Sequence, residues 1–203
     1  MTTARLGTFA DGVFAIAATL LILNVDTAIP EGSGELAHRL LEAWPAYVGY
    51  AVSFLTIGII WVNHHTVMSL VERADRRFLF ATVLFLMCVA FIPFPTRLLA
   101  EHLREEGARA AALLYGITLT TTAVMFSVVW FSASVGRRLL RADADPRTVS
   151  GITRSYLPGP WIYLGATLVA LVSPTASAIL YAAIAVFYVV ESSIFGRAAR
   201  EAG

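Results

Sequence analysis

The hydrophobic residues of the chain are gathered in long runs with few polar interruptions. A membrane-spanning helix requires about 20 mostly apolar residues, because each residue adds about 1.5 Å along the helix axis. Six runs approach or exceed this length, and each predicts a transmembrane helix: 6–25, 44–70, 78–99, 108–135, 157–172 and 175–195. The pattern predicts an all-α polytopic membrane protein, with residues 1–203 forming one six-helix unit.

Prolines punctuate two of the predicted helices. Pro93 and Pro95 lie near the end of the third helix, where a proline kinks or terminates a helix because it lacks a backbone N–H. Pro158 and Pro160 fit the first turn of the fifth helix, where a missing N–H costs nothing. The third helix is therefore predicted to bend, and the fifth to begin near residue 157.

Composition supports the membrane interpretation and excludes several classes of protein. Hydrophobic residues make up 58% of the chain and charged residues only 14%, whereas soluble domains carry about a quarter charged residues. The one cysteine, Cys88, lies inside an apolar run, so no disulfide framework is expected. We find no motif of a hydrolase, metalloprotease or phosphate-binding loop, and no basic patch that predicts a nucleic-acid partner. We therefore expect neither an enzyme nor a cofactor-binding protein.

Arginines are distributed unequally between the two sides of the predicted bundle. Most of the 15 basic residues lie in segments on the side of the amino terminus, whereas the opposite loops are rich in glutamate. Cytoplasmic segments of membrane proteins carry an excess of basic residues. The distribution predicts a cell-membrane protein whose amino and carboxyl termini are both cytoplasmic.

Asp11 is a charged residue near the start of the first predicted helix. An aspartate within a membrane helix costs about 2.5–3.5 kcal/mol, so its carboxylate needs a partner. The expected partners are His64 or His65 of the second helix, which lie at a similar depth, with the Trp61 N–H or Asn63 nearby. We interpret this group as a structural tie between helices, and a proton relay is the alternative. Two adjacent histidines point about 100° apart on a helix, so no metal site is predicted.

Two stripes can be distinguished on the first helix at 100° per residue. One is aliphatic with a single hydroxyl and contains Gly12, Ile16, Thr19 and Leu23, with Leu20 at its edge. The other, rotated by a quarter turn or more, contains Asp11, Ala15, Ala18 and Ile22. Small residues allow close approach of helices in membranes, so we expect the second stripe to pack against the protein. From the residues alone, the first stripe faces lipid or the core.

The stretch from Arg5 to Leu23 resembles the signature of the transmembrane protein 175 family, the endosomal and lysosomal potassium channels of animals and their bacterial relatives. The family pattern is an arginine, three residues and then Phe-Ser-Asp, which leads into an apolar helix. Arg5, Phe9 and Asp11 match this pattern, whereas Ala10 replaces the usual serine. The chain looks like the bacterial, single-unit kind.

The resemblance implies a homotetramer in the lipid bilayer, with the first helix of each subunit lining a central pore. It places the hydrophobic constriction on Ile16, Leu20 and Leu23, and the pore threonine on Thr19. It also implies a structural network of Arg5, Phe9, Asp11, Trp61, His64 and His65. The implied function is a cation channel in which K⁺ is the permeant ion and not a cofactor. Because the sequence has no Thr-Val-Gly-Tyr-Gly loop and an isoleucine collar would favour K⁺ only slightly, we expect weak selectivity.

Two other functions stay open at this point. One is a proton-permeable channel on the same scaffold. The other is a proton-coupled transporter that uses Asp11 and His64 or His65 as its relay. The transporter is the weaker alternative, since we detect no internal repeat of the kind that many transporters contain.

Overall fold

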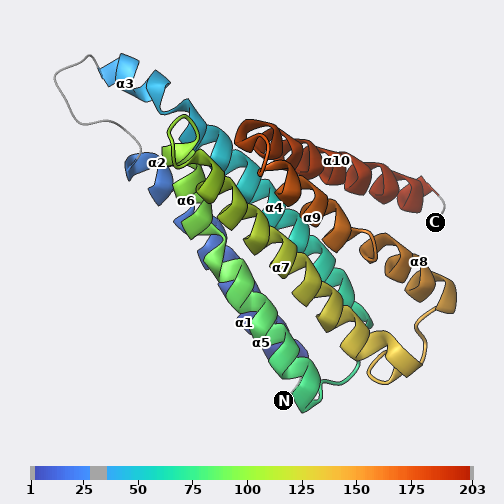
Figure 1. Ribbon diagram of the computed structural model, residues 1–203. Coiled ribbons are helices and arrows are strands. Elements are labelled where there is room, and N and C mark those ends of the chain that lie inside the picture. Colours follow the sequence, from blue (N-terminus) through green and yellow to red (C-terminus); the bar gives the residue numbers. More distant parts are fainter. Residues whose placement is uncertain (1–2, 28–35, 202–203) are drawn as a thin grey trace.

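The computed structural model describes residues 3–27 and 36–201, which form helices joined by short turns and loops, with one isolated β-bridge. The long helices are α1 (Thr3–Leu20), α4 (Trp44–Leu70), α5 (Arg76–Phe91), α7 (Ala108–Ser134) and α10 (Pro174–Glu201). The first four run in alternating directions, and α10 runs in roughly the same direction as α7 (Figure 1). Shorter helices complete the bundle: α2 (Leu23–Thr27), α3 (Leu36–Glu42), α6 (Pro93–His102), the 3₁₀ helix η1 (Val135–Arg137), α8 (Pro146–Tyr156) and α9 (Gly159–Val169).

The helices confirm the predicted polytopic all-α membrane fold. Among the described residues, the stretches long and apolar enough to cross a membrane are Thr3–Val25, Trp44–Leu70, Arg76–His102 and Ala108–Arg137. The second predicted helix has the bounds of α4, and the fourth differs from α7 by one residue at its end. The sixth predicted segment lies within α10, in which Pro174–Val190 is an apolar stretch among the described residues.

The fifth predicted helix is shorter in the structure than in the sequence-based prediction. It was expected over 157–172, but α9 contains only 11 residues and ends at Val169. At about 1.5 Å per residue, α9 alone reaches only about half of a hydrocarbon core. The preceding helix α8 was not predicted, because it is strongly amphipathic and a search for apolar runs does not detect it.

The first helix does not continue to Val25 as predicted. It is interrupted after Leu20, where Ile22 N donates to Thr19 O at 3.3 Å and Asn24 N to Leu21 O at 3.2 Å. These are the tighter i to i+3 bonds of a 3₁₀ turn. The Asn24 Nδ2 group also donates to Pro93 O at 3.0 Å, at the junction of α5 and α6. The predicted kink at Pro93 is confirmed, and Asn24 ties the end of the first helix to it.

Buried hydroxyl groups connect the helices inside the bundle. Ser53 Oγ of α4 lies 2.9 Å from Thr96 Oγ1 of α6 and 3.1 Å from the Tyr115 hydroxyl of α7. Thr167 Oγ1 of α9 lies 2.8 Å from the Tyr181 hydroxyl of α10. Each pair satisfies polar groups that would otherwise be stranded in an apolar interior.

Gly116 allows α7 to approach α9 and α10 closely beside this hydroxyl group. A Cβ at this position would lie 2.4 Å from the Tyr181 hydroxyl and 2.7 Å from Thr167 Oγ1. Real Cβ atoms do not approach other atoms so closely, so any larger residue would force the side chains of Tyr181 and Thr167 to move.

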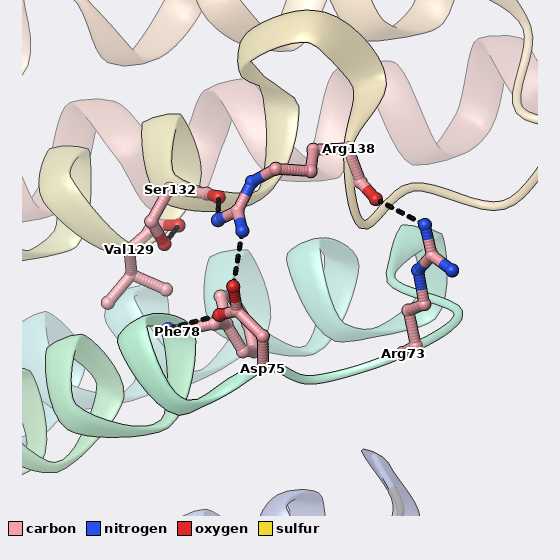
Figure 2. A network of polar contacts seen from close by, with 6 residues as sticks. All are labelled: Arg73, Asp75, Phe78, Val129, Ser132 and Arg138. Carbon is pink, nitrogen blue, oxygen red and sulfur yellow. Dashed lines mark hydrogen bonds and ion pairs between the residues drawn. The ribbon is translucent and has the colours of Figure 1, made fainter.

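A polar latch joins the loop after α4 to the segment after α7 (Figure 2). Val71 and Leu140 form the isolated bridge, and Glu72 N donates to Leu139 O at 2.9 Å. The Arg138 guanidinium contacts the Asp75 carboxylate and donates to Ser132 O, the latter at 2.9 Å. The bonds from Phe78 N and from Arg138 hold the pKa of the Asp75 carboxyl below its usual range.

The latch predicts a pH-dependent contribution of Asp75 to stability. Because the folded pKa is depressed, this contribution is fully present above the unfolded pKa of about 4 and is lost as the pH falls through the folded value. Asp75→Ala is expected to lower the melting temperature at pH 7 by about 2–4 °C, mainly through the lost helix cap. The effect should shrink below about pH 4.

Thermal unfolding of the purified wild-type and Asp75→Ala proteins, at pH 7 and below about pH 4, measures the change in melting temperature. Asp143→Ala is the matched control, because Asp143 is paired with its exposed neighbour Arg141, at 3.0 Å. Such surface pairs contribute little to stability. Equal melting temperatures for the two variants at pH 7 would contradict the role of the latch.

Candidate functional site

One face of α1 is packed into the core of the bundle. The side chains of this face are exposed by 3% or less, and they are Leu6, Ala10, Phe14 and Ala17, followed by Leu21 directly after the helix. They recur at three- and four-residue intervals, as one face of a helix does. α1 lies between α4 and α5, and the Phe14 ring packs on His64 of α4 and Phe85 of α5 with ring centroids 5.6 and 6.1 Å away.

The opposite face of α1 carries the four residues predicted to line a pore. Ile16 is 62% exposed, Leu20 43% and Leu23 57%, and Thr19 is also exposed. At 100° per residue, Ile16 and Thr19 lie roughly opposite Phe14 and Leu21 on the helix. A helix with one face in the core thus presents an aliphatic stripe outward. Leu23 lies beyond the break, in α2.

Thr19 supplies the hydroxyl group on this exposed stripe. Its Oγ1 donates to the carbonyl oxygens of its own helix, Ala15 O at 2.9 Å and Ile16 O at 3.0 Å. The hydrogen is thereby directed back to the backbone, and the lone pairs of the oxygen stay available on the exposed side.

Asp11 is paired with Trp61, one of its predicted neighbours. The Trp61 Nε1–H group donates to Asp11 Oδ1 at 2.8 Å and joins α1 to α4. Neither His64 nor His65 forms a hydrogen bond to Asp11 within the described residues, so the expected histidine contact is not observed. A carboxylate that accepts from an indole N–H gains a charge-assisted hydrogen bond, which is stronger than a neutral one.

The two histidines have different surroundings. His64 is only 2% exposed, and its ring stacks on Phe85 with centroids 5.6 Å apart. Its Nε2 atom is buried without a hydrogen-bond partner among the described residues. His65 is exposed, and its ring lies 6.0 Å from the Trp61 ring. His64 is therefore part of the core that packs against α1, whereas His65 lies on the exposed surface.

Arg5 and Phe9 lie on the exposed side of α1, away from the Asp11–Trp61 contact. Phe9 is 52% exposed, and Arg5 forms no ion pair with the described residues. Within a single subunit, the structure thus brings together Asp11 and Trp61 from the predicted network. It does not bring Arg5 or Phe9 into contact with them.

The second stripe of α1 occupies a different position from the one predicted. It was expected to pack against the protein, but the core face is the one that contains Phe14. Asp11, Ala15 and Ala18 instead line a groove beside α4, and Ile22 is 51% exposed. The small residues do lie near a second helix, but on the flank of α1 and not on its core face.

Asn24, which anchors the end of the first helix, was missed because it is one polar residue after an apolar run.

Comparisons with known proteins identify the family. A family model described as the endosomal/lysosomal potassium channel TMEM175 matches residues 5–93. A potassium channel from Chamaesiphon minutus is 40% identical over 194 residues, which cover 94% of this chain and 95% of that protein. A potassium channel from Streptomyces collinus is 45% identical over 152 residues, which cover 74% of this chain and 72% of that protein.

Structures and animal proteins agree with this assignment. The crystal structure of a lysosomal potassium-selective channel TMEM175 homolog from Chamaesiphon minutus matches with a TM-score of 0.84 and 37% identity, over 94% of this chain and 97% of that one. The endosomal/lysosomal proton channel TMEM175 of Gallus gallus is 31% identical over 143 residues, which cover 66% of this chain and 28% of that protein. These relatives are ion channels and not enzymes, and the family implies no cofactor. The chain belongs to the TMEM175 family of membrane ion channels.

Proposed function

We propose that the chain forms a homotetrameric, potassium-permeable channel whose pore is lined by α1 of each subunit. The observation that carries this proposal is the aliphatic stripe with Ile16 and Thr19, which is exposed on a helix whose opposite face is firmly packed. One such helix cannot enclose a conduit. Cyclic symmetry allows identical stripes from several subunits to meet on an axis. The bacterial relatives named as potassium channels support the choice of ion.

The narrowest part of the proposed pore is a ring of Ile16 side chains. Four such side chains form a dry collar, and an ion crosses it only when the collar widens and wets or when the ion sheds part of its water. Further rings at Leu20 and Leu23 extend the apolar section. The sequence contains no Thr-Val-Gly-Tyr-Gly filter that would replace the water with carbonyl oxygens. Selectivity for K⁺ over Na⁺ is therefore expected to be weak.

Thr19 provides the polar contact next to the collar. Its hydroxyl hydrogen is used within the helix, so its oxygen faces the proposed lumen as an acceptor. Four such oxygens would solvate a cation as it leaves the Ile16 ring, and an anion would find no donor there. The site therefore favours cations without a charged residue on the stripe.

We further propose that the arginine-rich end of the bundle lies in the cytoplasm of the cell, together with both termini. The amino terminus lies at the same end as the loop between α4 and α5 (Figure 1). This loop and the segment after α7 contain Arg73, Arg137, Arg138 and Arg141. An excess of basic residues at one end favours its retention on the cytoplasmic side.

A proton-permeable channel on the same scaffold is the second candidate. The observation that favours it is that curated animal relatives are named endosomal/lysosomal proton channels. The exposed stripe around Ile16 holds no titratable side chain that would relay protons. Protons would therefore have to cross the collar along a transient file of water. A proton-coupled transporter that uses Asp11 finds no support in relatives that are channels.

Flux measurements in liposomes test the proposed function. The purified protein, reconstituted at known density, is expected to release K⁺ faster than Na⁺ without saturating in the manner of a carrier. Proton flux is recorded in the same vesicles with a pH-sensitive dye. Proton flux without measurable K⁺ flux would favour the second candidate, and the absence of all three fluxes in an intact assembly would overturn both.

A further inference from the structure

A large groove opens along the side of the bundle, next to the flank of α1 that carries Asp11, Ala15 and Ala18. It has a volume of about 1130 Å³ and is bounded by α1, α4, α7, α8, α9 and α10. Its walls are mainly aromatic and aliphatic, with Phe54 and Ile57 from α4, Phe126 from α7 and Tyr163 from α9. The volume exceeds the usual range of about 300–1,000 Å³ for small-molecule pockets. The groove extends from the amphipathic α8 into the membrane-spanning part of α4.

Glycines leave room at several places in the wall. Gly58, Gly151 and Gly159 all line the groove, and a Cβ on any of them would meet no atom within 4 Å. A hydrocarbon chain can therefore lie directly against the backbone at these positions. The same space allows a larger side chain to be added at Gly151 without displacing protein atoms.

Basic residues stand at the mouth of the groove on α8. Arg147, Gly151, Arg154 and Ser155 share one face of this helix, because they are spaced by four, seven and eight residues. Gly151 and Ser155 line the groove, so Arg147 lies one helical turn from its lining and Arg154 directly precedes a lining residue. Both arginines are exposed, and neither forms an ion pair with the described residues.

The nearby acidic groups do not neutralise these arginines. α8 contains no acidic residue. The Asp145 carboxylate accepts from Arg147 N and Thr148 N at 3.1 Å and so caps the start of α8. Asp11, which also lines the groove, accepts from Trp61 and lies in a different helix. The opposite face of α8 is fixed to α7, since Trp130 Nε1 donates to Thr153 Oγ1 at 3.0 Å.

We propose that the groove binds an anionic phospholipid, with an acyl chain along the apolar wall and the headgroup phosphate at Arg147 and Arg154. An apolar groove that opens to the bilayer takes up hydrocarbon, and basic side chains at an interfacial helix attract anionic headgroups. Guanidinium groups suit phosphate because they donate in a planar, bidentate geometry. The bound lipid would lie in the leaflet on the side of the amino terminus.

Native mass spectrometry of the purified assembly tests this site. The protein is incubated with phosphatidylglycerol or with phosphatidylcholine, and bound lipids per chain are counted. Phosphatidylglycerol is expected to be retained in preference. Arg147→Gln and Arg154→Gln are each expected to weaken its retention roughly fivefold. Arg141→Gln is the matched control and should leave retention unchanged, since Arg141 is paired with Asp143 at the same end of the bundle.

A second variant tests the acyl-chain part of the groove. Gly151→Leu fills the open space at the mouth and is expected to reduce retention of both lipids while the assembly keeps its mass. Equal retention of the two lipids, or unchanged retention in both arginine variants, would overturn the proposal. The proposal would also be overturned if Gly151→Leu lost subunits but kept its lipids, because that result would show that a neighbouring copy of the chain occupies the groove. Because the number of bound lipids is measured without any ion flux, this experiment can fail or succeed independently of the proposed channel function.

Discussion

Ile16→Asn is expected to raise potassium flux roughly tenfold and to reduce discrimination against sodium. If the Ile16 side chains form a dry collar, four amides in their place hold water and lower the barrier to wetting. A barrier lowered by about 1.4 kcal/mol corresponds to a tenfold faster rate. Because Ile16 is 62% exposed in the subunit, the substitution leaves no core cavity, and the protein should remain folded. Potassium and sodium flux from the same liposomes, normalised to the amount of assembled protein, measures the effect.

Ile179→Asn is the matched control for this substitution. Ile179 is 63% exposed, so the chemical change and the exposure are nearly the same, but the residue lies on α10 and outside the proposed pore. Asparagine there is expected to leave ion flux at the wild-type level. If Ile16→Asn and Ile179→Asn assemble and conduct alike, the exposed face of α1 is not the permeation path.

Asp11→Ala is expected to cause the second large effect, a marked loss of assembled protein. The substitution removes the acceptor of the Trp61 indole N–H, which donates to Asp11 at 2.8 Å and joins α1 to α4. Hydrogen bonds to charged groups contribute about 1.5–3 kcal/mol. If α1 lines the proposed pore, a helix that loses this contact should not align with its copies in the assembly. Light scattering of the detergent-solubilised protein, corrected for detergent, gives the mass of the assembly and is expected to show a tetramer for the wild type.

Asp11→Asn separates the structural role from a proton relay. The amide oxygen can still accept from Trp61, but the side chain no longer titrates. Under the structural account, Asp11→Asn assembles considerably better than Asp11→Ala. If both variants assemble normally and lose only their response to pH, Asp11 is a relay and the tie is wrong.

Periodicity and length predicted most of the fold. A run such as 44–70 must be helical in a bilayer, because its backbone groups can find partners only within the helix. The kink at Pro93 followed from proline chemistry. Helix α8 was missed because its amphipathic pattern is not an apolar run. The break after Leu20 is accompanied by a contact of Asn24 with the distant Pro93 O, which no local pattern reveals.

Part of the candidate site was also accessible from the sequence. The stripe with Ile16 and Thr19 could be recognised from spacing alone, but spacing did not show whether it faces the core or the surface. The partner of Asp11 was predicted within a group of neighbours. The selection of Trp61 over His64 depends on packing, because the His64 ring is held between Phe14 and Phe85. The orientation of the His64 side chain is thus set by the packing of α1, α4 and α5 together, which sequence spacing does not reveal.

Cadmium block of Ile16→Cys tests the pore assignment most directly. In a Cys88→Ala background, the introduced thiols would face one another on the axis, and soft cations such as Cd²⁺ bind groups of thiolates. Potassium current through Ile16→Cys channels is predicted to fall when cadmium is added and to recover when a chelator removes it, whereas Ile179→Cys channels are unaffected. Assembled Ile16→Cys channels that conduct potassium equally with and without cadmium would contradict the proposal that α1 lines the pore.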